Sequence, residues 1–190
     1  ERPQKGRYRQ FHQIGVEVFG ANGPKIDAEL MSMTNSLWHK LGLKDVTLNI
    51  NTLGSSESRL KYKEILRDYF LDCKDSLDAD SIRRLEKNPL RILDSKNIEM
   101  QSIIENAPKL MDNLDDESRK HYNDFINYLE CLNIPFQVDT KLVRGLDYYN
   151  RTVFEWTTNE LGSQGAICAG GRYDSLVELM GGKPTPGVGF

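Results

Sequence analysis

The sequence has no long hydrophobic run. Its 190 residues are 38% hydrophobic and 28% charged, with a mean hydropathy of −0.55, and no stretch approaches the roughly 18 consecutive apolar residues of a membrane span. The first ten residues, ERPQKGRYRQ, contain no apolar segment and therefore do not form a signal peptide. We expect a soluble, cytoplasmic protein of one or two domains with no membrane partner.

Cysteine and histidine are scarce. The cysteines are odd in number and far apart, which excludes a complete disulfide framework and does not match the spacing of zinc ligands. The histidines are equally scattered and form no HExxH pattern. These residues are Cys73, Cys131, Cys168, His12, His39 and His121. We expect buried thiols and no metal held by the protein itself.

Positive charge is also limited. The net charge of −3 argues against a protein that coats nucleic acid by bulk electrostatics. A local basic patch remains possible, because residues 1–10 carry Arg2, Lys5, Arg7 and Arg9 against the single acidic Glu1. Composition alone favours a solvated basic loop there.

What is present begins with an alternating segment, FHQIGVEVF, at residues 11–19. Its period of two predicts a strand with Ile14, Val16 and Val18 on the core face. The opposite face presents a ring, an amide and a carboxylate in line, from Phe11, Gln13 and Glu17. The alternative is a half-exposed polar sheet face.

Helical and strand-like patterns then follow each other. An amphipathic helix is predicted after the GANGP turn and ends at Gly42, and VTLNIN at 46–51 predicts a strand. The apolar residues of that helix are Ile26, Leu30, Met33, Leu37 and Leu41. Residues 55–132 show helical periodicity almost throughout, with apolar stripes that include Leu60, Ile65, Leu66, Tyr69 and Phe70.

Strand patterns return at 135–139, 151–158 and 166–171, followed by a short helix at 174–180. We therefore predict an α+β protein in which a helical unit interrupts a sheet domain. The expected boundaries are 1–54 for the first part of the sheet domain, 55–134 for the helical insertion, and 135–190 for the second part.

Two further segments have residue types that suit a polar ligand. KLVRGLDYYNRTVFEW places Arg144, Tyr148 and Tyr149 around a glycine turn, and GGRYDSL supplies Tyr173 next to two glycines. The basic loop before Phe11 suits a nucleotide, because guanidinium groups bind phosphate oxygens and a ring stacks on a base. Ordinary packing of the tyrosines is the alternative.

The segments together resemble a known family. ERPQKGRYRQFHQIGVEVFG resembles motif 2 of a class II aminoacyl-tRNA synthetase, and LVRGLDYYNRTVFEW and CAGGRYDSLVELMGG resemble the two motifs particular to histidyl-tRNA synthetases. The likeness spans essentially the whole chain and is bacterial in type. It implies a class II synthetase-type antiparallel sheet flanked by helices, with a small inserted helical domain.

The resemblance also implies ligands and roles. The motif 2 hairpin would bind ATP with its Mg²⁺, with Glu1 near the adenine, Arg7 on the outer phosphates and Phe11 stacked under the base. L-histidine would lie on the same strand face, with Gln13 at its α-amino and carboxylate groups and Glu17 on the imidazole. The catalytic residues would be Gln13 and Arg144, the latter also in contact with histidine.

The remaining histidine-binding residues implied by the resemblance are Tyr148, Tyr149 and Tyr173. The expected reaction is the formation of histidyl-adenylate, followed by transfer of histidine to the 3′ end of tRNA(His) by a protein that is a homodimer at full length. The family's motif 1, two arginines of motifs 2 and 3 and the anticodon-binding domain are absent. We therefore expect an internal catalytic-domain piece of a longer protein, inactive by itself.

Two other interpretations stay open at this stage. One is a non-catalytic relative, such as the synthetase-like regulatory subunit of histidine biosynthesis, which keeps the fold and senses histidine. The other is a structural or tRNA-contacting module without a ligand pocket. The presence of Arg7, Phe11 and Arg144 together with an intact RGLDYY favours the enzyme.

Overall fold

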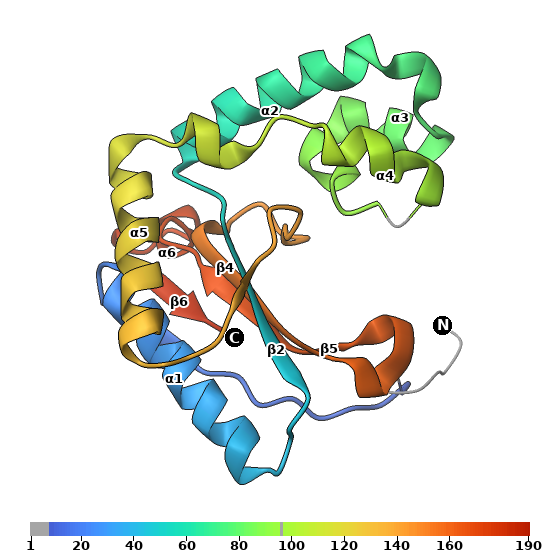
Figure 1. The fold of residues 1–190 in the computed structure, drawn as a ribbon. Coiled ribbons are helices and arrows are strands. Elements are labelled where there is room, and N and C mark those ends of the chain that lie inside the picture. Colours follow the sequence, from blue (N-terminus) through green and yellow to red (C-terminus); the bar gives the residue numbers. More distant parts are fainter. Residues whose placement is uncertain (1–7, 96) are drawn as a thin grey trace.

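The computed structural model describes residues 8–95 and 97–190, and Figure 1 shows one sheet with helices against it and a group of helices beyond its end. The strands are β1 (Glu17–Phe19), β2 (Val46–Thr52), β3 (Gln137–Val138), β4 (Asn150–Thr158), β5 (Ala166–Arg172) and β6 (Gly187–Gly189). The α-helices are α1 (Pro24–Lys40), α2 (Ser56–Asp72), α3 (Ala79–Lys87), α4 (Ile98–Glu105), α5 (Asp116–Cys131) and α6 (Leu176–Leu179). Short 3₁₀ helices are η1 (Lys74–Ser76), η2 (Pro89–Ile92), η3 (Leu110–Asn113) and η4 (Asn159–Gln164).

The strands form one sheet in the order β1-β6-β5-β4-β2-β3. All the described pairings are antiparallel except that of β2 with β3, which is parallel. The long central pair of β2 and β4 runs in register from Val46 opposite Thr158 to Thr52 opposite Thr152. The predicted α+β class, with a sheet rebuilt from segments on both sides of a helical stretch, is confirmed.

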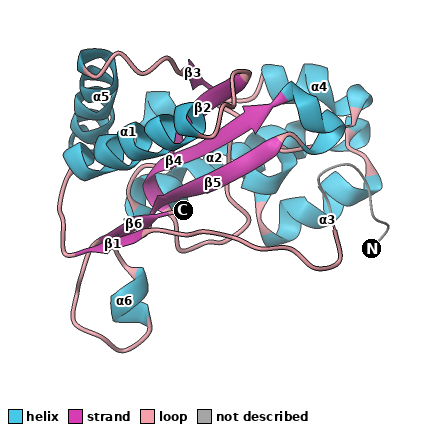
Figure 2. Ribbon diagram, turned by 90° about the horizontal axis from the view of Figure 1, so that it is seen from below, coloured by secondary structure: helices cyan, strands magenta, loops and turns pink. Residues whose placement is uncertain are grey.

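Helices α1 and α5 cover one face of the sheet (Figure 2). The core between them forms because alternate residues of each strand and one stripe of each helix are apolar. Its buried members are Ala28, Leu30, Met31, Leu48, Ile50, Phe125, Leu129, Ile134, Phe154, Trp156 and Val188. The opposite face of the sheet is therefore left open for other side chains.

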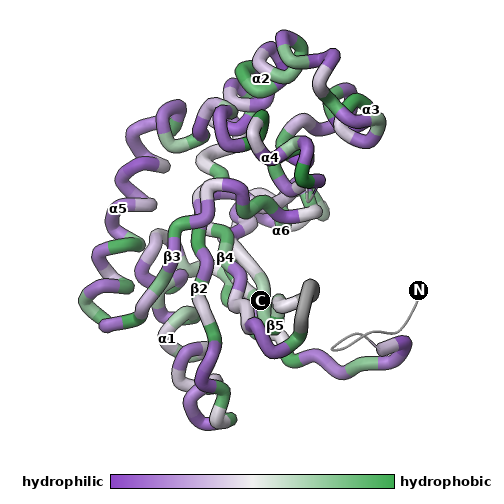
Figure 3. The backbone as a smooth tube through the Cα atoms, turned by 45° about the vertical axis from the view of Figure 1, so that its right-hand side comes forward, coloured by the Kyte–Doolittle hydropathy of each residue, from purple (hydrophilic) through white to green (hydrophobic). Residues whose placement is uncertain are grey.

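The helices that follow β2 have a core of their own. Tyr62, Leu66 and Phe70 recur every four residues on α2 and pack with buried residues of α3, η2 and α4. Hydrophobic and hydrophilic residues alternate along these helices (Figure 3). Leu60, which was predicted in the apolar stripe, is 64% exposed, and the buried residue at that end of the stripe is Tyr62. We call residues 56–114 the helical insert.

The helix starts in this region are strongly marked by sequence. Ser55, Asp78, Asn97 and Asp115 each accept a hydrogen bond from a backbone N–H in the first turn of α2, α3, α4 and α5. Such caps satisfy N–H groups that have no partner within the helix.

Helix α5 packs with the sheet although it follows the helical insert directly. Its Phe125 and Leu129 belong to the core under the sheet, whereas the core of the insert ends at Leu114. The boundary at 134 stays a prediction, and the packing favours one near residue 115 for the insert's own core.

The first predicted strand is mostly wrong. Only Glu17–Phe19 forms β1, with Val16 exchanging two backbone hydrogen bonds with Phe190, each 3.0 Å long. Residues 11–15 lie outside this pairing, and alternation alone does not hold a strand without a partner. Ile14, predicted in the core, is therefore 80% exposed.

Helix α1 confirms the predicted element and part of its predicted face, because Leu30 is buried and Ile26 packs against the core. Met33 and Leu41 are exposed, while Asp27 and Thr34 are fully buried with Leu30 and Met31.

The expectation of buried thiols is wrong for Cys131, which is exposed at the end of α5. Within the described residues, no helix is both long and apolar enough to cross a membrane.

Candidate active site

The open face of the sheet carries a carboxylate beside a tyrosine. Tyr173, which follows β5 and is 5% exposed, donates a hydrogen bond from its hydroxyl to Oε2 of Glu17 on β1. Burial, and then this hydrogen bond, raise the pKa of Tyr173, so it remains a neutral donor at physiological pH. Glu17 itself is exposed, and within the described residues its other oxygen, Oε1, accepts no hydrogen bond, so it can face a ligand.

The two glycines of β6 make room for this pair. Strand β6 lies between β1 and β5, and a Cβ atom at Gly189 would overlap the Glu17 carboxylate, while one at Gly187 would overlap the Tyr173 ring. Val188, between them, points into the core on the other face. The sequence GVG therefore lets both side chains lie flat on the sheet.

Two more tyrosines complete an aromatic cluster. The ring centroids of Tyr148 and Tyr149 are 4.7 Å apart, and they lie 6.0 and 6.2 Å from that of Tyr173, nearly perpendicular to it. Edge-to-face packing of this kind favours a fixed arrangement of rings. Burial raises the pKa of Tyr149 to about 12, with a further contribution from Tyr148.

Arg144 lies at the edge of this cluster. Its guanidinium carbon is 6.0 Å from the centroid of the Tyr149 ring, and Nη1 lies 3.2 Å from Oε2 of Glu155 on β4. Among the described residues, the buried Nε of Arg144 has no hydrogen-bond partner. A buried donor without a partner is uncommon in proteins, and the Arg144 side chain as a whole is 24% exposed.

The structure brings together five of the residues expected at one ligand site, namely Glu17, Arg144, Tyr148, Tyr149 and Tyr173. It does not bring Phe11 and Gln13 there: both are exposed, and in the described part of the chain no hydrogen bond or ring contact joins them to the cluster. Their roles, like those of all these residues, stay predictions. Glu1 and Arg7 lie outside the described residues.

Gln13 instead lines a cavity of about 360 Å³ with Trp38, Leu41 and Cys168. Trp38 and Leu41 belong to α1 or follow it, so this cavity is on the helix-covered side of the sheet. The reason is the missing strand: because residues 11–15 are not paired, the line of side chains predicted for that strand face does not form.

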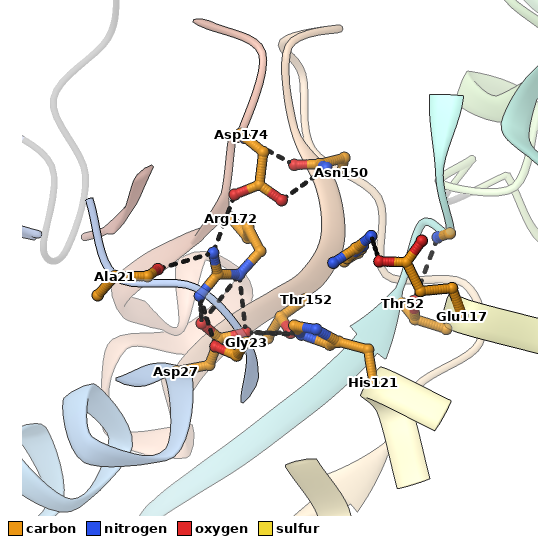
Figure 4. Close-up of polar contacts among 12 residues, drawn as sticks. Ala21, Gly23, Asp27, Thr52, Glu117, His121, Asn150, Thr152, Arg172 and Asp174 are labelled. Atoms are coloured by element: carbon orange, nitrogen blue, oxygen red, sulfur yellow. Dashed lines mark hydrogen bonds and ion pairs between the residues drawn. The ribbon is translucent and has the colours of Figure 1, made fainter. Parts of the chain in front are cut away.

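A buried polar network around Arg172, the residue before Tyr173 in the sequence, was not predicted (Figure 4). Arg172, 1% exposed, directs its guanidinium to both carboxylate oxygens of Asp27, with Nε at 3.1 and 3.2 Å, and to Asp174 at 2.9 Å. Asp27 also accepts from Thr152 at 2.6 Å and lies 3.0 Å from His121 Nε2. The network thus joins α1, α5, β4 and β5.

The negative charge of Asp27 is stabilised by the residues that bind it. Burial alone would raise the pKa of Asp27, but hydrogen bonds with His121 and Arg172 and the charge of Arg172 outweigh it and lower the pKa below its ordinary value. The only sequence feature that pointed to this network was Arg172, next to Tyr173. Nothing in the sequence marked its partner Asp27, which lies four positions after Gly23 on an apolar helix face.

Within the described residues, no group of three or more histidine, cysteine, aspartate or glutamate side chains is placed to hold a metal ion. The candidate site offers hydrogen-bond donors, the exposed carboxylate of Glu17, aromatic surface and the guanidinium of Arg144. Such a set suits a small polar ligand that has an N–H group and an anionic group.

Comparison with known proteins gives one consistent family. A profile described as histidyl-tRNA synthetase matches residues 1–190. The chain is 66% identical over 190 residues to the histidine–tRNA ligase of Ruthia magnifica subsp. Calyptogena magnifica, and 59% identical to that of Hydrogenovibrio crunogenus, spanning 100% of this chain and 45% of each relative. The chain thus spans about half the length of these curated relatives.

Solved structures agree. The crystal structure of apo S. aureus histidyl-tRNA synthetase superposes with a TM-score of 0.71 at 36% identity, over 92% of this chain and 43% of that one. A protein from Bacillus halodurans described as ATP phosphoribosyltransferase regulatory subunit/histidyl-tRNA synthetase matches with a TM-score of 0.59 over 92% of this chain and 49% of that one. At 23% identity this second likeness shows the fold alone. From the profile match over all its residues, the chain belongs to the histidyl-tRNA synthetase family.

Proposed function

We propose that this chain is the histidine-binding and activating part of a histidine–tRNA ligase. Such a protein joins L-histidine to ATP as histidyl-adenylate and then transfers the histidyl group to the 3′ end of tRNA(His). The observation that carries the proposal is the exposed carboxylate of Glu17, held by Tyr173 beside Tyr149 and Arg144 on one sheet face. The names of the relatives point to the same activity.

Glu17 would select the amino acid. Its Oε2 accepts the Tyr173 hydroxyl, so Oε1 would accept the imidazole N–H, while the ring packs among the tyrosines. A site built around such a bond rejects analogues that leave its polar group unpaired, by factors of about 10⁴. The raised pKa of Tyr173 supports this role, because a neutral hydroxyl keeps donating to the carboxylate.

Arg144 would act in the activation step. An oxygen of the histidine carboxylate attacks the α-phosphorus of ATP, a new P–O bond forms, and the bond to pyrophosphate breaks with its electron pair leaving on pyrophosphate. Negative charge on the phosphoryl oxygens is stabilised by a fixed guanidinium better than by mobile water. The guanidinium of Arg144, whose side chain is 24% exposed, would supply donors to such an oxygen.

ATP itself would be held by Glu1, Arg7 and Phe11, with Gln13 at the histidine carboxylate, and its bound Mg²⁺ would neutralise charge on the outer phosphates. The exposed ring of Phe11, 64% accessible, has a free face for stacking on adenine. In the complete protein we further propose a cytoplasmic homodimer.

The test is a kinetic comparison in the full-length protein. Glu17→Ala should raise the KM for histidine at least a hundredfold and the KM for ATP less than threefold, measured by ATP–pyrophosphate exchange. Glu29→Ala, which removes an exposed carboxylate from α1, is the matched control and should change neither. Equal effects of Glu17→Ala on both KM values would refute the imidazole role.

Titration calorimetry with histidine, combined with pyrophosphate exchange, separates the ligase from the regulatory alternative. A ligase binds histidine and ATP and exchanges pyrophosphate, whereas a histidine-sensing subunit binds histidine without exchange. Loss of detectable histidine binding would contradict both and leave a structural or tRNA-contacting module.

A further inference from the structure

Residues 143–149, which carry Arg144, Tyr148 and Tyr149, belong to no helix or strand and lie between β3 and β4. We call them the site loop. The chain just before the loop is tied to the sheet, because Asn51 of β2 donates to the carbonyl oxygens of Thr140 at 3.3 Å and Leu142 at 3.0 Å. Within the loop, the side chains of Arg144 and Tyr149 contact Glu155 of β4 and Tyr173. Backbone carbonyl oxygens of the loop are bound by groups outside the sheet.

Three side chains of the helical insert reach the site loop. Arg91 of η2 donates to the carbonyl oxygen of Gly145, Arg59 of α2 donates to that of Tyr149, and the Asn88 amide donates to Oδ1 of Asp147 at 3.1 Å. The contacts fall on residues 145, 147 and 149, so they bracket the loop. Figure 1 shows this orange segment between the sheet and the insert.

The donors are themselves fixed to the core of the insert. Asn88 is the C-terminal cap of α3, and Arg91 lies between Leu90 and Ile92, which are 6% and 0% exposed. Arg59 stands one turn before Tyr62, which is buried in the same core. The donors are therefore fixed to the core of the insert, and a shift of the insert would move the loop groups that they bind.

We propose that the helical insert positions the site loop, with Arg59, Asn88 and Arg91 acting as a clamp that sets where Arg144 and Tyr149 lie. These three are positioning residues, since they contact the loop and would act on the proposed site only through it. The inference rests on the proposed function of Arg144 and Tyr149. Small misplacements of an aligned group reduce the rate strongly, so a loosened loop lowers activation without loss of the fold.

The decisive variant is Arg91→Ala in the full-length protein. A hydrogen bond with a charged donor contributes about tenfold or more to an equilibrium, so kcat/KM for histidine in ATP–pyrophosphate exchange should fall at least tenfold. The melting temperature should stay within about 2 °C, because Arg91 is exposed. Arg91→Lys, which keeps a charged donor, should recover part of the loss.

Arg83→Ala is the matched control. Arg83 lines the same cavity as Arg91 and carries the same charge, but it pairs with Asp80 at 2.9 Å instead of the loop. Arg83→Ala should change kcat/KM for histidine in ATP–pyrophosphate exchange less than twofold. An equal fall in both variants would show that the charge of the cavity matters rather than the clamp, and would overturn the inference.

Hydrogen exchange of the backbone reads the loop directly. Arg91→Ala should speed exchange of the amides of residues 144–149 about tenfold and leave those of β4 unchanged, whereas unchanged loop protection would overturn the clamp. Arg144→Ala distinguishes failure of the clamp from failure of the proposed function. If Arg144→Ala abolishes pyrophosphate exchange while the double variant Arg59→Ala, Arg91→Ala has no effect, only the clamp is refuted. If Arg144→Ala keeps full activity, the proposed function is refuted.

Discussion

Replacing Asp27 by asparagine tests the buried network around Arg172. The substitution keeps the size of the side chain but removes the charge that faces Arg172, and both residues are almost fully buried, at 0% and 1% exposure. Removing one partner of a buried ion pair costs about 3–5 kcal/mol, because the other charge is left without compensation.

The structure places the cost near the lower end of that range. In the variant, Arg172 keeps Asp174 at 2.9 Å and the carbonyl of Gly23 at 2.8 Å. We therefore expect a loss of about 3 kcal/mol, equal to a fall in melting temperature of about 6–12 °C for a chain of this size. Scanning calorimetry at pH 7 measures it, with Glu29→Gln on the exposed face of α1 as control.

The pH dependence gives a second check. Because the pKa of folded Asp27 lies below its ordinary value of 3.8, the stabilisation is present above that pH and is lost as the pH falls through the folded value. The difference between the wild-type chain and Asp27→Asn should therefore be constant near neutrality and shrink in strong acid. A variant within about 1 kcal/mol of wild type at pH 7 would refute the account of the network.

Two further substitutions test single features. Gly189→Ala should raise the KM for histidine at least tenfold in pyrophosphate exchange with little change for ATP, because the new methyl group occupies the place of the Glu17 carboxylate; an unchanged KM would show that Glu17 has another position available. Asp115→Ala should cost about 1–3 kcal/mol in urea unfolding, since it removes the cap of α5 and acceptors for Ser55 and Ser58. Asp116→Ala, which removes the neighbouring exposed carboxylate, is its control, and equal losses in the two variants would contradict the capping argument.

Much of the fold could be predicted because its signals are local. The strand at β4 and the helix at α1 have periodic apolar residues, and Gly42, with a φ of 76°, follows α1 where the pattern ends. Residues 11–15 had a similar alternation, but a strand also needs a partner in register. Sequence periodicity does not contain that information.

The site was partly predictable for the same reason. Tyr148, Tyr149 and Arg144 are close in sequence, and a turn brings such residues together. The pair of Glu17 and Tyr173 depends on β6 lying between their strands, and the pair of Asp27 and Arg172 depends on α1 packing under β5. Contacts between residues about 150 positions apart follow from topology, and a carboxylate on a helix otherwise reads as an exposed residue.

The glycines of β6 also affect the local stability of the sheet. Glycine in a strand costs roughly 0.5–1 kcal/mol relative to alanine, because the unfolded chain gains more freedom there. β6 has only three residues and two of them are glycine, so the strand beneath the candidate active site is a weak part of the sheet. A ligand bound to Glu17 and Tyr173 would bridge β1 and the end of β5 across this strand, so ligand binding and the integrity of the sheet edge are energetically linked.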